Sequence, residues 1–464
     1  MNTSPEAAFN TQSQRLAAWA MRASYDDLSD DARQSFKNHI LDTLGCALGA
    51  LGEGPILACR AQVEEFGGTG PCTLIGGGTT APPQAAFYNT CLTRYLDFMD
   101  NFLGESETCH PCDNFASVLA AAEYAGASGR DFLAALAVAY QVQCRMTQAA
   151  PIMQRGFDHT AQLAFSVPAG VARALGMNAE QAANAIGICG AGQQAFAVIR
   201  AVPISQWKGL ASSQTALGCT HAAFLARRGV TGPLFVFEGP KGFVNAISEP
   251  IEVDWDSEKL DVIIQTLLKS YNSEVHTQTA VQCTLELHQA NPFDPADVAA
   301  IDVEDFQVAY DITGGGAYGE KHTVRTKEHA DHSIPYVVAA ALLDGEVTPA
   351  QYDLERIVQG DIQRLLHKVT VRPNDNFTQR YPKQMPCRVT VRLRNGEILA
   401  HDVVDYPGFP TRAFTWEQTC AKFERLAAKS ADASLQAQIE DAVSSLDTRP
   451  VADLTRLLAQ AGPK

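Results

Sequence analysis

Three side chains within the segment RYLDFMDNFLGESETCHPCDN, residues 94–114, are of types that suit proton transfer. Asp97 and Asp100 stand three residues apart, and residues with this spacing are neighbours on one face of a helix. His110 follows in a stretch predicted to be irregular, where functional side chains on rigid scaffolds tend to lie. A capped helix followed by a solvated acidic loop explains the spacing equally well, so other parts of the chain must decide between the two interpretations.

Lys208 and His276 are unusually placed polar residues outside this segment. Lys208 comes at the start of a predicted helix, where the helix dipole disfavours a positive charge, although a solvated lysine is the commoner explanation. His276 comes at the entry to another predicted helix, close to the join between two predicted domains, where clefts form. Both residues are therefore candidates for a site.

Three further positions are open to a functional or a structural interpretation. Tyr318, between a glycine run and Lys321, could reach a cleft as a phenol donor or could simply cover its loop. His159 lies in a polar turn ahead of a helix and is similarly ambiguous. For His332 the structural interpretation is favoured, because this residue could cap the following helix together with Asp331.

This set of Asp, His, Lys and Tyr side chains comes without HExxH, GxSxG or a phosphate-binding loop. It suits proton transfer next to a carboxylate. A His or Asp base removes a C–H proton, cations hold the carboxylates and stabilise the developing charge, and an acid protonates the departing group. This chemistry requires no metal or organic cofactor. Cys109 and Cys112 form a CxxC pair, but no second cysteine pair completes a zinc site.

Composition narrows the class of partner. A net charge of −16 argues against nucleic acid, which needs a basic face, and requires that an anionic substrate be met by a local cluster of cations. No apolar run is long enough to span a membrane, and the polar N-terminus MNTSPEAAFNTQSQR lacks the features of a signal peptide. Twelve scattered cysteines indicate a reducing compartment, so we expect a cytoplasmic protein.

A chain of 464 residues is too long for one ordinary hydrophobic core, so we expect two domains. Helical periodicity dominates residues 1–270 and returns near the C-terminus, which predicts a large helical domain made of residues 1–270 and completed by residues 405–464. Residues 271–404 mix helices with strands and predict a smaller α+β domain. The predicted strands are Ala299–Tyr310, His367–Val371, and a hairpin of Arg388–Leu393 and Ile398–Val404 around an Asn-Gly turn.

One predicted helix bears directly on the opening segment. It begins at Pro82-Pro83 and runs to about Phe98, so that Asp97 and Asp100 would lie at its C-terminal end. The helix dipole disfavours acidic groups there, which weakly favours a functional reason for the pair.

Five motifs in order give the chain a resemblance to the MmgE/PrpD family. They are LDFMDNF…HPCDN at 96–114, GFDHT at 156–160, SQWKG at 205–209, EVHTQTAV at 274–281 and ADHSIPYVVAAALLDG at 330–345. The family includes 2-methylcitrate dehydratase, cis-aconitate decarboxylase and iminodisuccinate epimerase, which act on small polycarboxylates without a cofactor. The resemblance implies a large helical domain with a smaller α+β lid, a site in the cleft between them, and a homodimer.

The resemblance also implies roles for individual residues. The family's functional positions fall on Asp97, His110, Lys208, His276 and Tyr318. Supporting substrate contacts are expected from Asp100, Asn101, His159 and Gln278.

We therefore expect a hydro-lyase similar to 2-methylcitrate dehydratase, in which Asp97 and His110 handle the proton α to a carboxylate. The decarboxylase carries threonine where this chain has Asn101, which weakens that alternative. HPCDN is similar to the HPSDN of the dehydratase branch, with Cys112 replacing serine. Decarboxylation of cis-aconitate, epimerisation of an amino-dicarboxylate and a catalytically silent protein that retains the fold are the alternatives.

Overall fold

The computed structural model describes residues 10–463 except 202, 249 and 252. Most of the polar N-terminal stretch on which we based the absence of a signal peptide therefore lies outside the described residues. Among the described helices, none is by itself both long and apolar enough to cross a bilayer, and only one sharply bent helix pair meets that criterion jointly.

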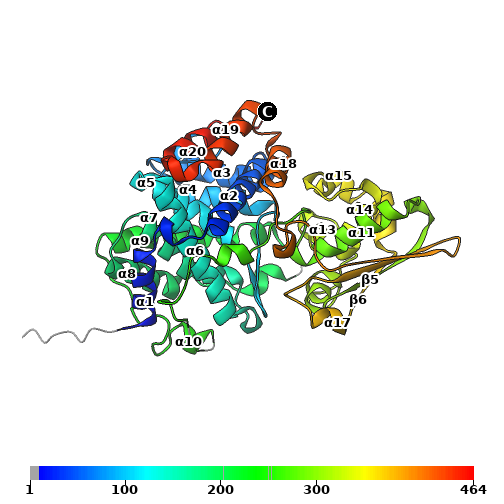
Figure 1. Ribbon diagram of the computed structural model, residues 1–464, viewed down its shortest axis with the longest axis horizontal. Helices are drawn as coiled ribbons and strands as arrows, with labels where there is room; N and C mark the ends of the chain where they lie inside the picture. Colours follow the sequence, from blue (N-terminus) through cyan, green and yellow to red (C-terminus); the bar gives the residue numbers. More distant parts are fainter. Residues whose placement is uncertain (1–9, 202, 249, 252, 464) are drawn as a thin grey trace, which may run out of the picture.

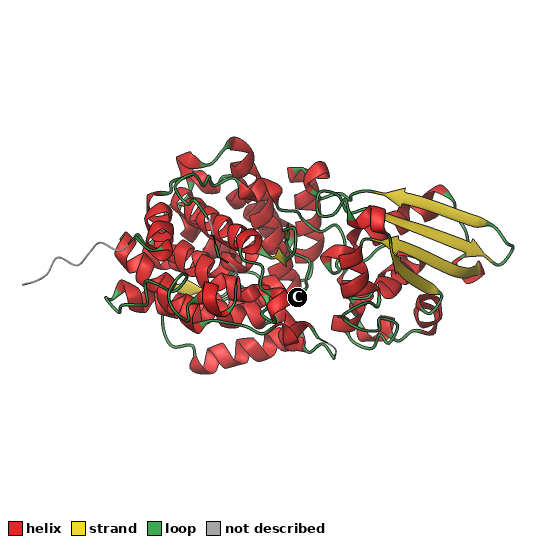
Figure 2. Cartoon of the chain, turned by 90° about the horizontal axis from the view of Figure 1, so that it is seen from below, coloured by secondary structure: helices red, strands yellow, loops and turns green. Residues whose placement is uncertain are grey.

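The chain forms two bodies, a large helical one and a smaller one that contains the main sheet (Figures 1 and 2). Each has its own hydrophobic core: one is built from residues 16–263 and 423–461, the other from residues 267–409. The predicted fold class, mainly α with a smaller α+β part, is confirmed.

The large body is a bundle of helices. Its elements are α1 (Gln12–Arg22), α2 (Asp30–Ala50), α3 (Gly54–Phe66), α4 (Pro82–Tyr95), α5 (Phe115–Ala125), α6 (Gly129–Ala149), α7 (Leu163–Ala174), α8 (Ala179–Gly192), α9 (Ala211–Arg227), α10 (Phe243–Ala246), α18 (Trp416–Ala427), α19 (Ala433–Ser444) and α20 (Val451–Leu458), with two small hairpins, β1–β2 (Cys72–Thr73, Thr79–Thr80) and β3–β4 (Phe102–Leu103, Thr108–Cys109). Ser29 and Asn178 cap the N-termini of α2 and α8, where their side chains accept hydrogen bonds from the backbone N–H groups of Ala32 and Gln181.

The C-terminal helices share the hydrophobic core of the large body. Helix α18 packs against α2, and two glycines of α2 make this close approach feasible. A Cβ atom at Gly45 would lie 3.2 Å from the Cα of Phe423, and one at Gly49 would lie 3.3 Å from the carbonyl oxygen of Leu426. Residues far apart in the sequence thus build one core.

The smaller body is a four-stranded sheet in the order β6-β5-β7-β8, covered by helices (Figure 2). Strands β5 and β6 are parallel, whereas β5–β7 and β7–β8 are antiparallel. Its elements are α11 (Gln278–Ala290), β5 (Val298–Asp305), α12 (Gln307–Ala309), α13 (Lys327–Ala330), α14 (Ile334–Asp344), α15 (Leu354–Ile357), α16 (Gly360–Leu366), β6 (Val369–Pro373), α17 (Asp375–Thr378), β7 (Cys387–Leu393) and β8 (Ile398–Val403).

Two predicted elements end earlier than expected. Helix α4 ends at Tyr95 rather than near Phe98, because Asp97 adopts a left-handed backbone with φ of 57°. Strand β5 ends at Asp305, whose carboxylate accepts a hydrogen bond from the N–H of Phe306 and begins a helical turn. The early end of α4 matters for function, because Asp97 and Asp100 then no longer lie on one face of a helix and point in different directions.

Candidate active site

A cavity lies between the two bodies and is lined by residues of both. Residues 94–269 provide one wall, which we call the helical wall; residues 274–332 of the smaller body provide the other, the lid wall. The helical wall is lined by Arg94, Asp97, Asn101, Thr108, His110, Met153, His159, Arg200, Ile204, Lys208 and Lys269, and the lid wall by Glu274, Ile312, Tyr318, Lys321 and His332.

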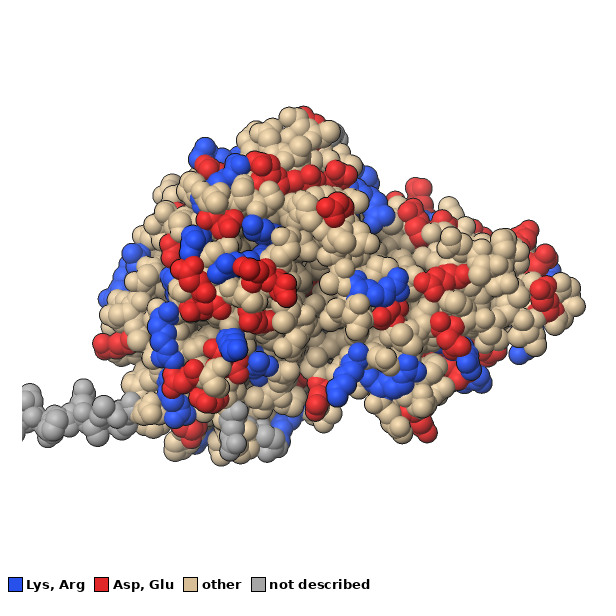
Figure 3. Space-filling model, in the orientation of Figure 1, with Lys and Arg blue, Asp and Glu red and all other residues tan. Residues whose placement is uncertain are grey.

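Positive charge dominates this lining. Five Lys or Arg side chains face two carboxylates, although acidic residues outnumber basic ones in the whole chain, 52 to 36. On the face drawn in Figure 3, acidic and basic side chains are interspersed, so the local excess of cations is a property of the cavity. Such a lining attracts a small molecule that carries several negative charges.

Asp97 is the centre of the ion pairs on the helical wall. Its Oδ1 accepts hydrogen bonds from Arg94 Nη1 and Lys269 Nζ, both at 3.0 Å, and its Oδ2 accepts one from Lys208 Nζ. Burial would raise the pKa of Asp97, but Lys208, Lys269 and Arg94 outweigh it and hold this pKa well below its usual range. Asp97 is therefore an anion that positions cations, and a weak base.

Arginines hold both imidazoles of the helical wall. Arg94 Nη2 lies 3.2 Å from His110 Nε2, and His110 Nδ1 lies 2.8 Å from the carbonyl oxygen of Asp100, so His110 carries its proton on Nδ1. His159 Nε2 lies 3.0 Å from Arg200 Nη2. Burial, assisted by Arg94, lowers the pKa of His110 well below its usual range, and burial lowers that of His159 to about 3. Both rings are neutral, with Nε2 occupied by an arginine donor.

Other predicted residues of the helical wall divide into two groups. Asn101 lines the cavity, and its buried Oδ1 has no hydrogen-bond partner among the described residues, so this oxygen is available to a ligand. Asp100 instead points away from the cavity and accepts hydrogen bonds from Cys112 N–H at 3.1 Å and Tyr140 Oη at 2.9 Å. Asp100 thus supports the loop that carries His110. Cys112 is buried and does not line the cavity.

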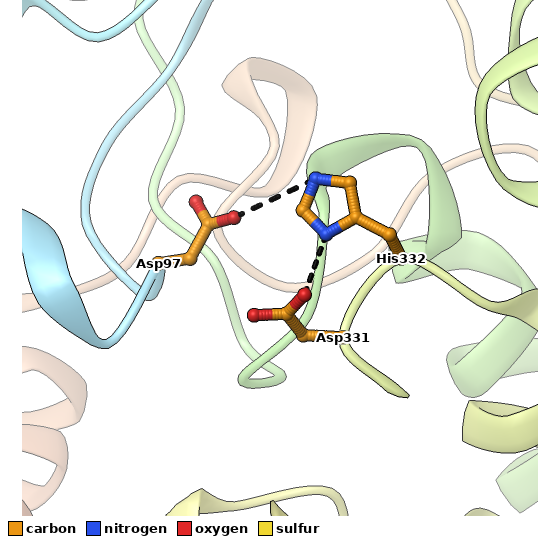
Figure 4. A group of neighbouring side chains, drawn as sticks. All are labelled: Asp97, Asp331 and His332. Carbon is orange, nitrogen blue, oxygen red and sulfur yellow. Dashed lines mark hydrogen bonds and ion pairs between the residues drawn. The ribbon is translucent and has the colours of Figure 1, made fainter. Parts of the chain in front are cut away.

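The lid wall presents an imidazole in a different setting. His332 Nδ1 lies 2.5 Å from Asp331 Oδ1, and its Nε2 faces the helical wall, 4.0 Å from Asp97 Oδ2 (Figure 4). Lys327 Nζ in turn donates to Asp331 Oδ2 at 2.9 Å. We expected His332 and Asp331 to cap the following helix, but the cap of α14 is Ser333, whose side chain accepts a hydrogen bond from Tyr336 N–H. The capping interpretation of His332 is therefore wrong.

His276 and Gln278, both expected at the site, do not line the cavity. Glu274 stands between His276 and the cavity: its carboxylate accepts from His276 Nδ1 and from His276 N–H, both at 2.8 Å. His276 Nε2 lies 3.1 Å from Tyr381 Oη. The side-chain amide of Gln278 forms hydrogen bonds with the backbone of Tyr271 and with Ser273, so Gln278 has a structural role. Tyr318 lines the cavity as expected.

A lysine from the C-terminal part of the chain supports the cavity from behind. Lys422 Nζ donates to the carbonyl oxygens of Phe98 at 2.8 Å and Lys269 at 2.9 Å, and forms a buried ion pair with Asp42. Helix α18 thereby joins the segments that carry Asp97 and Lys269.

Both parts of the chain match one protein family. Residues 14–256 match the MmgE/PrpD N-terminal domain, and residues 271–448 match the MmgE/PrpD C-terminal domain. The chain belongs to the MmgE/PrpD family. The predicted resemblance is confirmed, and the break between the two matched regions, residues 257–270, lies where the membership of the two hydrophobic cores changes.

Several curated members of the family are similar to this chain over most of its length. A 2-methylcitrate dehydratase from Cupriavidus necator is 27% identical over 412 residues, which cover 82% of this chain and 83% of that protein. A 2-methylcitrate dehydratase from Escherichia coli K12 is 28% identical over 403 residues, 79% of this chain and 80% of that protein. An alkylcitrate dehydratase from a fungal species is 25% identical over 472 residues, 92% and 90% of the two chains.

Sequence analysis of this MmgE/PrpD protein missed several cavity residues that carry charge. Arg94 had a detectable signal, since it is the only charged residue in α4. Lys269 follows the apolar pair Leu267-Leu268, which is a similar signal. Arg200 lies in a stretch without clear periodicity and gave none. Residues missed or not assigned to the site are Arg94, Arg200, Lys269, Glu274, Lys321 and His332.

Asp97, Asp331 and His332 also lie close enough together to be tested as metal ligands. Their charges are already matched by protein cations: Lys208 and Lys269 bind Asp97, and Lys327 binds Asp331. A divalent cation there would have to compete with these ammonium groups at short range. The donor set therefore fits ion pairing better than metal binding.

Proposed function

We propose that this protein is a cofactor-independent hydro-lyase that removes water from a small polycarboxylate, with 2-methylcitrate as the first substrate to test. Three observations support the proposal: the family of the chain, its similarity to relatives named 2-methylcitrate dehydratase, and the chemistry of the cavity. Among these, the observation that carries it is the cation-rich cavity of an acidic protein, whose lining also includes three histidines.

Elimination of water needs three kinds of group, and the cavity offers each. Cations bind the carboxylates and stabilise the negative charge that develops when the neighbouring C–H proton leaves. An imidazole removes that proton. Burial lowers the pKa of Lys208 to about 8, although Asp97 opposes the change, so its ammonium group can protonate the departing hydroxyl near neutral pH.

The cavity also suggests how the substrate is oriented. The amino group of Lys321 makes no ion pair among those found for the described residues, and the Oδ1 of Asn101 accepts no hydrogen bond there. We assign Lys321 to a substrate carboxylate and Asn101 to a substrate hydroxyl. We assign Tyr318, which lines the same wall as Lys321, as a donor to a second carboxylate.

The test is to incubate the purified full-length chain with 2-methylcitrate, citrate and cis-aconitate and to identify the products by mass spectrometry. The proposal predicts loss of one water from 2-methylcitrate and an unsaturated tricarboxylate product. A Lys208→Met variant purified in the same way controls for dehydratases of the expression host. Failure to consume any of the three compounds would refute the proposal.

The same assay separates the alternatives within the family. Release of CO₂ from cis-aconitate would identify a decarboxylase. Loss of optical rotation from a chiral iminodisuccinate, without loss of mass, would identify an epimerase. A catalytically silent protein would consume none of them, and its melting temperature would not rise with any polycarboxylate.

We further infer that the protein forms a homodimer in the cytoplasm. Large apolar side chains are exposed close to the cavity: Phe196 at 67%, Val198 at 72% and Trp207 at 44%. Burial of such a patch in a second copy would remove it from water. All twelve cysteines are free thiols, which fits a reducing compartment. Analytical ultracentrifugation of the wild type and of Trp207→Ser tests the dimer, and cell fractionation tests the location.

A further inference from the structure

The lid wall carries an imidazole whose arrangement is that of a general base. We propose that His332, oriented by Asp331, is the residue that removes the C–H proton of the substrate. This inference rests on the proposed hydro-lyase function and gives a catalytic role to a residue for which the sequence favoured a structural one.

The His332 ring is held in one orientation by its carboxylate neighbour. The contact of 2.5 Å between His332 Nδ1 and Asp331 Oδ1 places the ring proton on Nδ1, because an ionised carboxylate only accepts. The lone pair of Nε2 is then directed into the cavity, toward the helical wall (Figure 4). Lys327 Nζ, at 2.9 Å from Asp331 Oδ2, fixes the carboxylate in turn. The ring thus has one defined tautomer and one open nitrogen.

The other imidazoles in or near the cavity are less suited to accept a proton. The Nε2 atoms of His110 and His159 already accept hydrogen bonds from arginines, so neither can accept a proton unless the arginine moves. His276 lies behind Glu274 and does not line the cavity. Among the described histidines that line the cavity, only His332 has an Nε2 free of a protein donor.

The charges around His332 favour the ring once it is protonated. Once His332 has taken the proton, its Nε2–H faces Asp97 Oδ2 at 4.0 Å, while Nδ1–H remains on Asp331. Two carboxylates therefore stabilise the imidazolium at the moment when it forms. Before reaction the ring is neutral, because burial and the nearby Lys208 ammonium both lower the pKa of His332.

The proposed step balances. The lone pair of His332 Nε2 takes the proton from the carbon next to the carboxylate, and the C–H electron pair becomes the new C=C bond. The C–O bond breaks with its electrons on oxygen, which receives a proton from the Lys208 ammonium and leaves as water. The proton that His332 took from the substrate then passes to the Lys208 amine, which restores both groups. Asp97 Oδ2 faces both of them. No oxidant or reductant is needed.

The test uses His332→Gln with 2-methylcitrate as probe and His288→Gln as a matched control. His288 also lies in the smaller body, at the end of α11, where its Nε2 bonds the carbonyl oxygen of Phe293 outside the cavity. We expect kcat of His332→Gln to fall by about 10²- to 10⁴-fold, the usual contribution of a general base, with KM changed by less than about threefold. The control should keep wild-type values.

Two further variants separate a catalytic role from a structural one. In His332→Ala, added imidazole should restore part of the lost turnover, which a merely structural histidine would not allow. Asp331→Asn should lower kcat more than it raises KM, since it disturbs the orientation of the base. An active wild type with His332→Gln within about fivefold of its kcat, or no rescue of His332→Ala by imidazole, overturns the assignment alone. A wild type inactive on every polycarboxylate overturns the proposed function as well.

Discussion

The two walls of the cavity use the same kinds of side chain in opposite ways. On the helical wall, His110 and His159 are held by Arg94 and Arg200, and burial keeps both rings neutral. On the lid wall, His332 is held through its other nitrogen by a carboxylate, which leaves Nε2 open. An arginine partner occupies the reactive nitrogen, whereas a carboxylate partner exposes it and favours its protonated form.

This difference assigns separate tasks to the two walls. Four of the five cations that line the cavity come from the helical wall, so that wall is suited to binding and neutralising carboxylates. The lid wall carries the open imidazole and is suited to moving the proton. Variants that affect one wall and spare the other can therefore break or sharpen the comparison.

The largest effect is expected from Asp97→Asn. The change leaves Arg94, Lys208 and Lys269 buried without their shared anion, and removing one partner of a buried ion pair typically costs about 3–5 kcal/mol. The free energy of unfolding, measured with urea, should fall by an amount in this range. Asp402→Asn, which breaks a half-exposed pair with Arg388, is the control and should cost less than about 1 kcal/mol. Equal losses would contradict the central place of Asp97.

The next largest effect is expected from Lys208→Met. This variant keeps Lys269 and Arg94 on Asp97 but removes a cation and the proposed proton donor from the cavity. Loss of one preorganised donor commonly lowers kcat by about 10²- to 10³-fold, and here KM should rise too. Steady-state kinetics measure both constants. A normal KM would remove Lys208 from the binding wall.

A smaller effect concerns stability at acid pH. The pKa of His159 is lowered by burial to about 3, below its unfolded value of about 6.5, so between these pH values the unfolded chain binds a proton that the folded chain does not. Stability must therefore fall on acidification through this window, by up to about 1.4 kcal/mol per pH unit for this one group. His159→Gln should flatten the dependence of unfolding free energy on pH, and His288→Gln is the matched control. An unchanged slope would contradict the buried, neutral state of His159.

The smallest effect is expected from Tyr381→Phe. The variant removes one hydrogen bond to His276 Nε2, typically worth about 1 kcal/mol, and leaves the lining of the cavity untouched. Turnover should stay within a few-fold of the wild type, while the melting temperature falls slightly. A large loss of kcat would instead place His276 and Tyr381 in the reaction, as the sequence motif suggested for His276.

The elements that sequence analysis predicted well are those with local signals. The hairpin around the Asn-Gly turn depends on a few neighbouring residues, and the structure forms it between β7 and β8. The early end of α4 depends on Asp97, whose left-handed backbone is accompanied by ion pairs to Lys208 and Lys269, both far away in the sequence. Local patterns do not contain that information.

The same limit explains the site. Asp97, Asn101, His110, His159, Lys208 and Tyr318, all candidates from the sequence, line the cavity, while their roles stay predictions. Within the EVHTQ motif, however, spacing does not reveal that Glu274 faces the cavity while His276 and Gln278 face the interior. Likewise, only the structure shows that Ser333 caps α14 and frees His332. Which side of a turn faces a cleft is set by tertiary packing.

The most direct test of the separate tasks of the two walls is the rise in melting temperature that 2-methylcitrate causes in three proteins. A ligand that binds the native state must stabilise it. We predict a clear rise for the wild type, a similar rise for the inactive His332→Gln variant, and a much smaller rise for Lys208→Met. A rise in Lys208→Met equal to that of the wild type, together with none in His332→Gln, would contradict the account.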